Sequence, residues 1–128
     1  MAARLRKARR RRYVVDYDWL WQRHDPTARA VLRAVVSHVS PDVAHSTLDR
    51  FIASLPADSR GVRGRAGWAV FPVDTDCGAA AVDIVSGGED VADGIQSGAD
   101  AVFDALTQVD GVSITWHQLT SPDTCRPE

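Results

Sequence analysis

The stretch DPTARAVLRAVVSHV (residues 25–39) decides the predicted fold, because it determines which element comes after the first predicted strand of the chain. Asp25 is a suitable helix N-cap, and Pro26 occupies the first helical position, where proline is tolerated. Apolar side chains then recur at helical spacing, at Ala28, Val31, Leu32, Val35 and Val39. The pattern predicts a helix that begins at Pro26 and ends near Val39.

The segments on either side of this stretch predict a strand and a second helix. RYVVDYDWLW (residues 12–21) alternates, which is typical of a strand. Its core face would carry Tyr13, Val15, Tyr17, Trp19 and Trp21. SPDVAHSTLDRFIASLP (residues 40–56) repeats the cap and proline signature at Ser40 and Pro41. It predicts a helix whose apolar stripe is Ala44, Leu48, Phe51, Ile52 and Leu55.

The C-terminal half predicts a hairpin, a long helix and a last strand. WAVFPV (68–73) and AAAVDIV (79–85) flank the turn DTDCG, and Pro72 places the first of these strands at a sheet edge. Residues 89–108 form a helical pattern in which Gly94 and Gly98 would allow another backbone to approach. Its stripe is Val91, Ile95, Ala99, Val102 and Leu106. Residues 110–119 alternate as a strand, with Val112, Ile114 and Trp116 facing the core.

This order of elements predicts an α+β fold. The expected architecture is a single-domain two-layer sandwich, ferredoxin-like, with the order β-αα-β-β-α-β and a flexible basic N-terminal arm. The arm would cover residues 1–12, the α+β domain residues 13–120, and a polar C-terminal tail residues 121–128.

The charge of the chain is divided between the arm and the rest. The 128 residues have a formal net charge of -2, with 15 cationic and 17 acidic side chains. Seven of the cations lie in the arm: Arg4, Arg6, Lys7, Arg9, Arg10, Arg11 and Arg12. Residues 13–128 therefore carry 15 minus 7, or 8, cations against 17 acids, a net charge of -9. Blocks of like charge are typical of solvated tails that bind partners.

Several classes of protein are not supported by the sequence. Asp16 and Asp18 interrupt the apolar stretch that comes after the cations, so neither a signal peptide nor a membrane span is expected. Cys77 and Cys125 have no zinc-ligand or disulfide-framework spacing. The expected location is the cytoplasm, or a virion if the chain is a phage structural subunit, and no cofactor is expected.

The open face of the predicted sheet would collect polar side chains opposite the aromatic core face. Asp16, Asp18, Asp83, Thr115 and His117 would converge there, since neighbouring strands lie about 4.8 Å apart. Carboxylates with an imidazole are ligands for a divalent cation that could activate water. A metal-dependent phosphodiesterase is therefore one hypothesis, with Asp16, Asp18, Asp83 and His117 as candidate catalytic residues. The alternative is an ordinary solvated polar face.

The loop SRGVRGRAG (residues 59–67) is the second candidate site. Arg60, Arg63 and Arg65 alternate with glycines, a composition suited to a phosphate backbone. It lacks the lysine of a P-loop and does not come after a strand, so nucleotide hydrolysis is not supported. The alternative reading is a flexible connector.

The leading hypothesis is a non-enzymatic interaction module. Its arm and its Gly/Arg loop would dock on nucleic acid or another acidic surface, through Arg4, Arg6, Lys7, Arg9, Arg10, Arg11, Arg12, Arg60, Arg63 and Arg65. A structural assembly subunit, such as a phage neck or tail protein, is an alternative. In that case the arm of one copy would lie along the acidic stripe Asp93, Asp100 and Asp104 of the next, giving a homo-oligomer.

Overall fold

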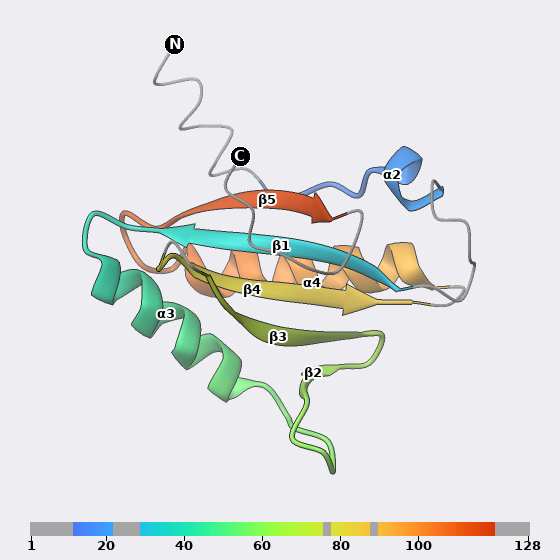
Figure 1. Ribbon diagram of the computed structural model, residues 1–128, viewed down its shortest axis with the longest axis horizontal. Coiled ribbons are helices and arrows are strands. Elements are labelled where there is room, and N and C mark those ends of the chain that lie inside the picture. Colours follow the sequence, from blue (N-terminus) through green and yellow to red (C-terminus); the bar gives the residue numbers. More distant parts are fainter. Residues whose placement is uncertain (1–11, 22–28, 76–77, 88–89, 120–128) are drawn as a thin grey trace.

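A five-stranded antiparallel sheet is the centre of the computed structural model, which describes residues 12–21, 29–75, 78–87 and 90–119 (Figure 1). The order of strands across the sheet is β2-β3-β4-β1-β5. Their bounds are β1 Ala30–Ser37, β2 Arg63–Arg65, β3 Trp68–Asp74, β4 Ala80–Ser86 and β5 Ser113–Leu119. Every neighbouring pair is antiparallel. β4 is the middle strand, and β1 is an interior strand that pairs with β4 on one side and with β5 on the other.

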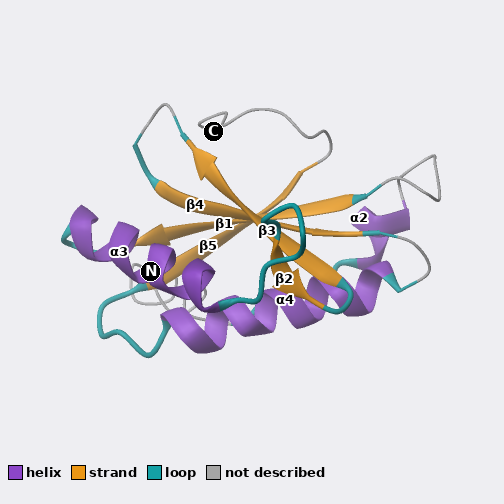
Figure 2. Ribbon diagram, turned by 90° about the horizontal axis from the view of Figure 1, so that it is seen from below, coloured by secondary structure: helices purple, strands orange, loops and turns teal. Residues whose placement is uncertain are grey.

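Two long helices lie on the same side of this sheet. α3 (Pro41–Ser54) and α4 (Val91–Leu106) form the second layer, as Figure 2 shows with the sheet seen edge-on. We call the covered side the inner face and the opposite side the outer face. Among the described residues no helix covers the outer face, and α2 (Tyr17–Trp21) is a single turn beside β5. None of the described helices combines the length and apolarity needed to cross a membrane.

The helix predicted over residues 26–39 is wrong in its described part, because residues 30–37 form the interior strand β1. Leu32 and Ala34 are fully buried on the inner face, while Val31 and Val35 line the outer face. A strand that is apolar on both faces loses the alternation by which strands are recognised, and its side chains then also match a helical stripe. Its β-branched valines favour the strand. The predicted cap residues Asp25 and Pro26 lie outside the described residues.

The strand predicted over residues 12–21 is also wrong. Residues 12–16 are extended but pair with no strand, and residues 17–21 form α2. Asp16 begins this helix as its cap, since its Oδ1 accepts a hydrogen bond from the backbone nitrogen of Trp19 at 3.2 Å. The predicted alternation holds for the extended part alone, where Tyr13 and Val15 are buried.

The remaining elements agree with the sequence. The predicted stripe of α4 is buried along its whole length, and four of the five predicted stripe residues of α3 are buried, with Ile52 half-buried. β3, β4 and β5 lie where the sequence places them. β3 is not the edge strand throughout, because β2 pairs with its first residues, Trp68–Val70. Pro72 lies beyond that pairing, where β3 is the edge strand among the described residues. The N–H group that proline lacks has no neighbouring strand to bind on that edge.

The molecule is thus an α+β two-layer structure, as predicted, but the predicted order β-αα-β-β-α-β is wrong in its first half. The described elements run α2-β1-α3-β2-β3-β4-α4-β5. One strand replaces the first predicted helix, and one helical turn replaces the first predicted strand.

Gly94 is a glycine of α4 at which another backbone comes very close, which confirms the predicted close approach. A Cβ atom added there would lie within van der Waals overlap of Ser86 Oγ and of the Gly67 carbonyl oxygen. Ser86 is itself held in place by donating a hydrogen bond to that carbonyl, at 2.7 Å. The helix can lie this close only because position 94 has no side chain.

We predict that Gly94→Ala lowers the free energy of unfolding by about 2 kcal/mol, because overpacking outweighs the better helix propensity of alanine. Ser97→Ala on the exposed side of the same helix is the control and should be neutral or slightly stabilising. Chemical denaturation of the two variants measures the difference. Equal stability of Gly94→Ala and the wild type would contradict this packing.

Candidate functional site

The last cation of the basic arm, Arg12, is held by α4. Its Nη2 lies 2.7 Å from Asp104 Oδ1 and its Nη1 lies 3.3 Å from Asp100 Oδ1. The guanidinium carbon is 4.9 Å from the centre of the Phe103 ring, a cation–π distance. The hydrogen bonds to Asp104 and Asp100 raise the pKa of Arg12. The acidic stripe of α4 thus binds a cation of its own chain; Arg4, Arg6, Lys7, Arg9, Arg10 and Arg11 lie outside the described residues.

The residues after Arg12 are fixed to α4 and β5 by hydrogen bonds from side-chain amides. Gln96 Oε1 accepts from the backbone nitrogen of Val15 at 3.0 Å, and Gln96 Nε2 donates to the backbone oxygen of Tyr13 at 2.7 Å. The side chain of Gln96 thereby makes the backbone hydrogen bonds that a neighbouring strand would otherwise make. The Tyr13 hydroxyl donates to Gln118 Oε1 at 2.7 Å, and Trp19 Nε1 donates to the Leu119 carbonyl at 3.1 Å. The point at which the arm leaves the domain is therefore well defined.

The Gly/Arg loop does not present three free guanidinium groups. Arg63 Nη1 donates to the Leu55 carbonyl at 2.7 Å and to the Ala53 carbonyl at 3.3 Å, so it binds free carbonyls at the end of α3. Arg60 Nη2 lies 3.2 Å from Asp58 Oδ2 within the loop.

Asp58 organises this loop, because its Oδ1 accepts hydrogen bonds from the backbone nitrogens of Arg60 and Val62. These bonds lower the pKa of Asp58. Arg65, at the end of the edge strand β2, is exposed. Of the three arginines it is the one most available to an outside anion.

The predicted open-face constellation is assembled only in part. Asp83 and His117 do lie on the outer face, but each pairs in register with Arg33 of β1, which stands between them. Asp16 lies just before α2 and Asp18 lies within it. Asp16 Oδ2 accepts a hydrogen bond from Gln118 Nε2. In the described ranges, no cluster of three or more histidine, cysteine or acidic side chains could hold a metal ion. The four candidate catalytic residues are therefore not brought together.

Arg33 is the residue that the sequence reasoning missed. Its Nε donates to Asp83 Oδ1 at 2.7 Å and its Nη2 donates to Asp83 Oδ2 at 3.0 Å, a bidentate ion pair. The two side chains are only 9% and 16% exposed. The expectation that Asp83 is a solvent-facing carboxylate is therefore wrong. A signal was present, since Arg33 and Asp83 are single opposite charges within two apolar runs, AVLRAVV and AAAVDIV.

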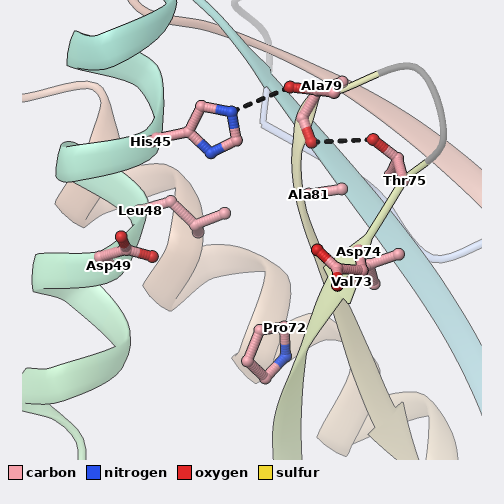
Figure 3. Close-up of a pocket in the computed structure, with 10 residues that line it drawn as sticks. His45, Leu48, Asp49, Pro72, Val73, Asp74, Thr75, Ala79 and Ala81 are labelled. Carbon is pink, nitrogen blue, oxygen red and sulfur yellow. Dashed lines mark hydrogen bonds between the residues drawn. The ribbon is translucent and has the colours of Figure 1, made fainter.

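A small pocket lies between α3 and the β3–β4 hairpin. It has a volume of about 370 Å³, and Asp49 and Asp74 face it from the helix and the strand end (Figure 3). His45 is engaged there, because its Nε2 donates to the Gly78 carbonyl at 2.9 Å. Thr75 donates to the Ala79 carbonyl at 3.1 Å. Two of the four polar side chains that line the pocket, His45 and Thr75, thus bind the hairpin backbone, and the pocket shows no nucleophile with an adjacent base.

Comparison with known proteins gave no relative: no protein-family model matches the chain, and neither curated proteins nor solved structures gave a match. The chemistry of these surfaces is therefore the basis of any functional proposal.

We predict that Asp83→Ala lowers the free energy of unfolding by about 3 kcal/mol, because it leaves the buried Arg33 cation without its carboxylate. The double variant Arg33→Leu/Asp83→Leu should return to within about 1 kcal/mol of the wild type, since both charges are then gone. Asp110→Ala, at an exposed carboxylate, is the control. Urea denaturation decides between the outcomes, and equal losses in the single and double variants would show that the pair is not a unit.

Burial raises the pKa of Tyr13 to about 12 from an ordinary value of 10.0. The folded state therefore holds this proton more tightly than the unfolded chain does. Its contribution to stability is complete below pH 10 and is lost as the pH rises towards 12. We predict that the stability of Tyr13→Phe falls less steeply over this window than that of the wild type, as measured by urea denaturation at a series of pH values. Identical slopes for Tyr13→Phe and the wild type would refute the assignment.

Proposed function

We propose that this chain is a non-enzymatic interaction module that binds nucleic acid through its basic N-terminal arm. The observation that carries the proposal is the concentration of seven cations in residues 1–12, the last of which, Arg12, is anchored to α4. Arginine binds phosphate bidentately, and each neutralised phosphate releases condensed counterion. The arm therefore has the side chains needed to bind a polyanion such as nucleic acid.

The anchoring of Arg12 supports this role physically. Its contacts with Asp100, Asp104 and Phe103, together with the Gln96 bonds to residues 13 and 15, determine where the arm joins the domain. The rest of the chain has a net charge of -9 and repels a polyanion. Binding would therefore be confined to the arm and to cations near it.

The Gly/Arg loop is proposed as a weaker secondary contact. Arg65 is exposed on β2 and can reach a phosphate directly. Arg60 would have to exchange its contact with Asp58, and Arg63 its bonds to the carbonyls at the end of α3. We rank Arg65 first among the three.

We also infer that the β1-α3-β3-β4-α4-β5 unit is ferredoxin-like. The spatial order β5-β1-β4-β3 with both helices on one face supports this assignment. Proteins of this topology that recognise RNA stack bases on aromatic residues of the open face, and here that face carries an ion pair and valines. This contrast favours the arm as the binding element. We propose the cytoplasm as the place of action, where nucleic acid is available.

We predict that the chain binds duplex DNA or single-stranded RNA with a steep dependence on salt. Deleting residues 1–11 should reduce the slope of log K against log [salt] by several units, because six cations are removed. Arg65→Ala should change the slope by about one unit. Fluorescence anisotropy with labelled oligonucleotides at several salt concentrations measures both.

Arg50→Ala, which removes an exposed cation of α3 outside the arm and the Gly/Arg loop, is the matched control and should leave the slope near the wild-type value. An unchanged slope after deletion of residues 1–11 would refute the arm as the binding element. No binding to either nucleic acid by the wild type would refute the proposal and favour an acidic protein surface as the partner.

A further inference from the structure

The guanidinium group of Arg12 contacts three side chains of α4, and we refer to these interactions together as the Arg12 contact. Two of the partners are the carboxylates of Asp104 and Asp100, at 2.7 Å and 3.3 Å from Nη2 and Nη1. The third is the ring of Phe103, which comes between the two aspartates in sequence. Residues four apart are neighbours on a helix surface, so the two carboxylates act on one cation.

The Arg12 contact uses the same donors that a phosphate group would use. A guanidinium group is a planar fork of N–H donors that matches carboxylate and phosphate equally well. Both terminal nitrogens of Arg12 are directed at carboxylates of its own chain. These two nitrogens can therefore bind a phosphate only after they leave Asp100 and Asp104.

The backbone next to Arg12 is held by a separate set of hydrogen bonds. Gln96 accepts from the backbone nitrogen of Val15 and donates to the backbone oxygen of Tyr13, and the Tyr13 hydroxyl donates to Gln118. None of these bonds involves the guanidinium group. The side chain of Arg12 can therefore leave α4 while the backbone that comes after it stays in place.

The exposure of the Arg12 contact makes it reversible. The side chains of Arg12 and Asp104 are 46% and 61% exposed, so water can replace each partner when they separate. Asp100 Oδ1 also accepts a hydrogen bond from Gln96 Nε2 at 3.1 Å, and it keeps this partner when Arg12 leaves. Exposed ion pairs contribute little to stability and are screened by salt. A dense array of phosphates can therefore displace the two carboxylates.

We propose that Asp100 and Asp104 withhold Arg12 from nucleic acid and release it when phosphate replaces them, a form of autoinhibition that rests on the proposed role of the arm. In the free protein Arg12 is neutralised by α4. In the complex it leaves α4 and adds one phosphate contact to those of the rest of the arm. The two carboxylates thereby lower the affinity of the arm for nucleic acid.

Binding of the full chain to a short labelled DNA duplex, measured by fluorescence anisotropy at several salt concentrations, tests the proposal. Asp100→Asn/Asp104→Asn keeps the shape of both side chains but removes the charges that hold Arg12. The variant should bind about fivefold more tightly than the wild type at about 0.1 M salt. Its slope of log K against log [salt] should be steeper by about one unit, because one more phosphate is neutralised. Circular dichroism shows whether the variant is folded.

Two controls separate the release of Arg12 from the general loss of negative charge. Asp93→Asn/Asp110→Asn removes two exposed carboxylates outside the Arg12 contact and should keep the wild-type slope. Arg12→Gln provides the second control, since it leaves no cation at position 12 to be released. In that background the Asp100→Asn/Asp104→Asn substitutions should change the affinity no more than the first control does.

NMR of the wild type is a second measurement and needs no substitution. In the free protein, NOEs should join the side chain of Arg12 to the Phe103 ring, and the ring of Tyr13 to that of Trp116, whose centres are 5.5 Å apart. Saturation with the duplex should remove the first set and leave the second, because only the guanidinium group leaves α4.

Several results would overturn the proposal. One is an increase in affinity that is equally large with and without Arg12, which would be a general effect of charge. Another is wild-type affinity and slope in Asp100→Asn/Asp104→Asn, and a third is persistence of the Arg12–Phe103 NOEs in the complex. In each of these cases the wild type still binds DNA, so the proposed function stands. Absence of binding by the wild type and by every variant refutes the proposed function together with the autoinhibition.

Discussion

The constraint on which the structure depends is that β1, an interior strand of the sheet, carries apolar side chains on both of its faces. Leu32, Ala34 and Val36 on its inner face are buried under α3 and α4, and both helices also pack against β4. On its outer face, β1 carries Val31, Arg33 and Val35, and Arg33 is held by Asp83 of β4. β1 thus contributes to the core on its inner face and holds the Arg33–Asp83 ion pair between valines on its outer face.

Two surfaces of different chemistry result, and they lie on separate parts of the molecule. The arm joins the domain at α4, on the inner side, where Asp100 and Asp104 hold Arg12. The outer face lies across the sheet from α4 (Figure 2). The anchor of the cationic arm and the Arg33–Asp83 ion pair are therefore on opposite sides of the sheet.

Much of the fold could be predicted because most elements have a single apolar face. The stripe from Val91 to Leu106 and the alternation around Ile114 match the observed burial. β1 could not be predicted by the same reasoning, since residues that are apolar on both faces fit a helix and a strand equally well. The backbone of Tyr13 and Val15 is hydrogen-bonded by the side chain of Gln96 and not by a neighbouring strand. The spacing of apolar residues cannot reveal a hydrogen-bond partner of this kind. The prediction of the candidate catalytic site was wrong for the same reason. Asp83 and His117 do share a face of the sheet, but Arg33 stands between them, and Asp16 caps α2.

The most direct test of the central claim is native-state hydrogen exchange measured by NMR. β1 pairs with a strand on each side, and its inner face is buried under the helices. The backbone amide protons of Leu32–Val36 should therefore exchange only through global unfolding, with a free energy of exchange equal to the free energy of unfolding. Exchange of these amides at a free energy well below that of unfolding would contradict the account.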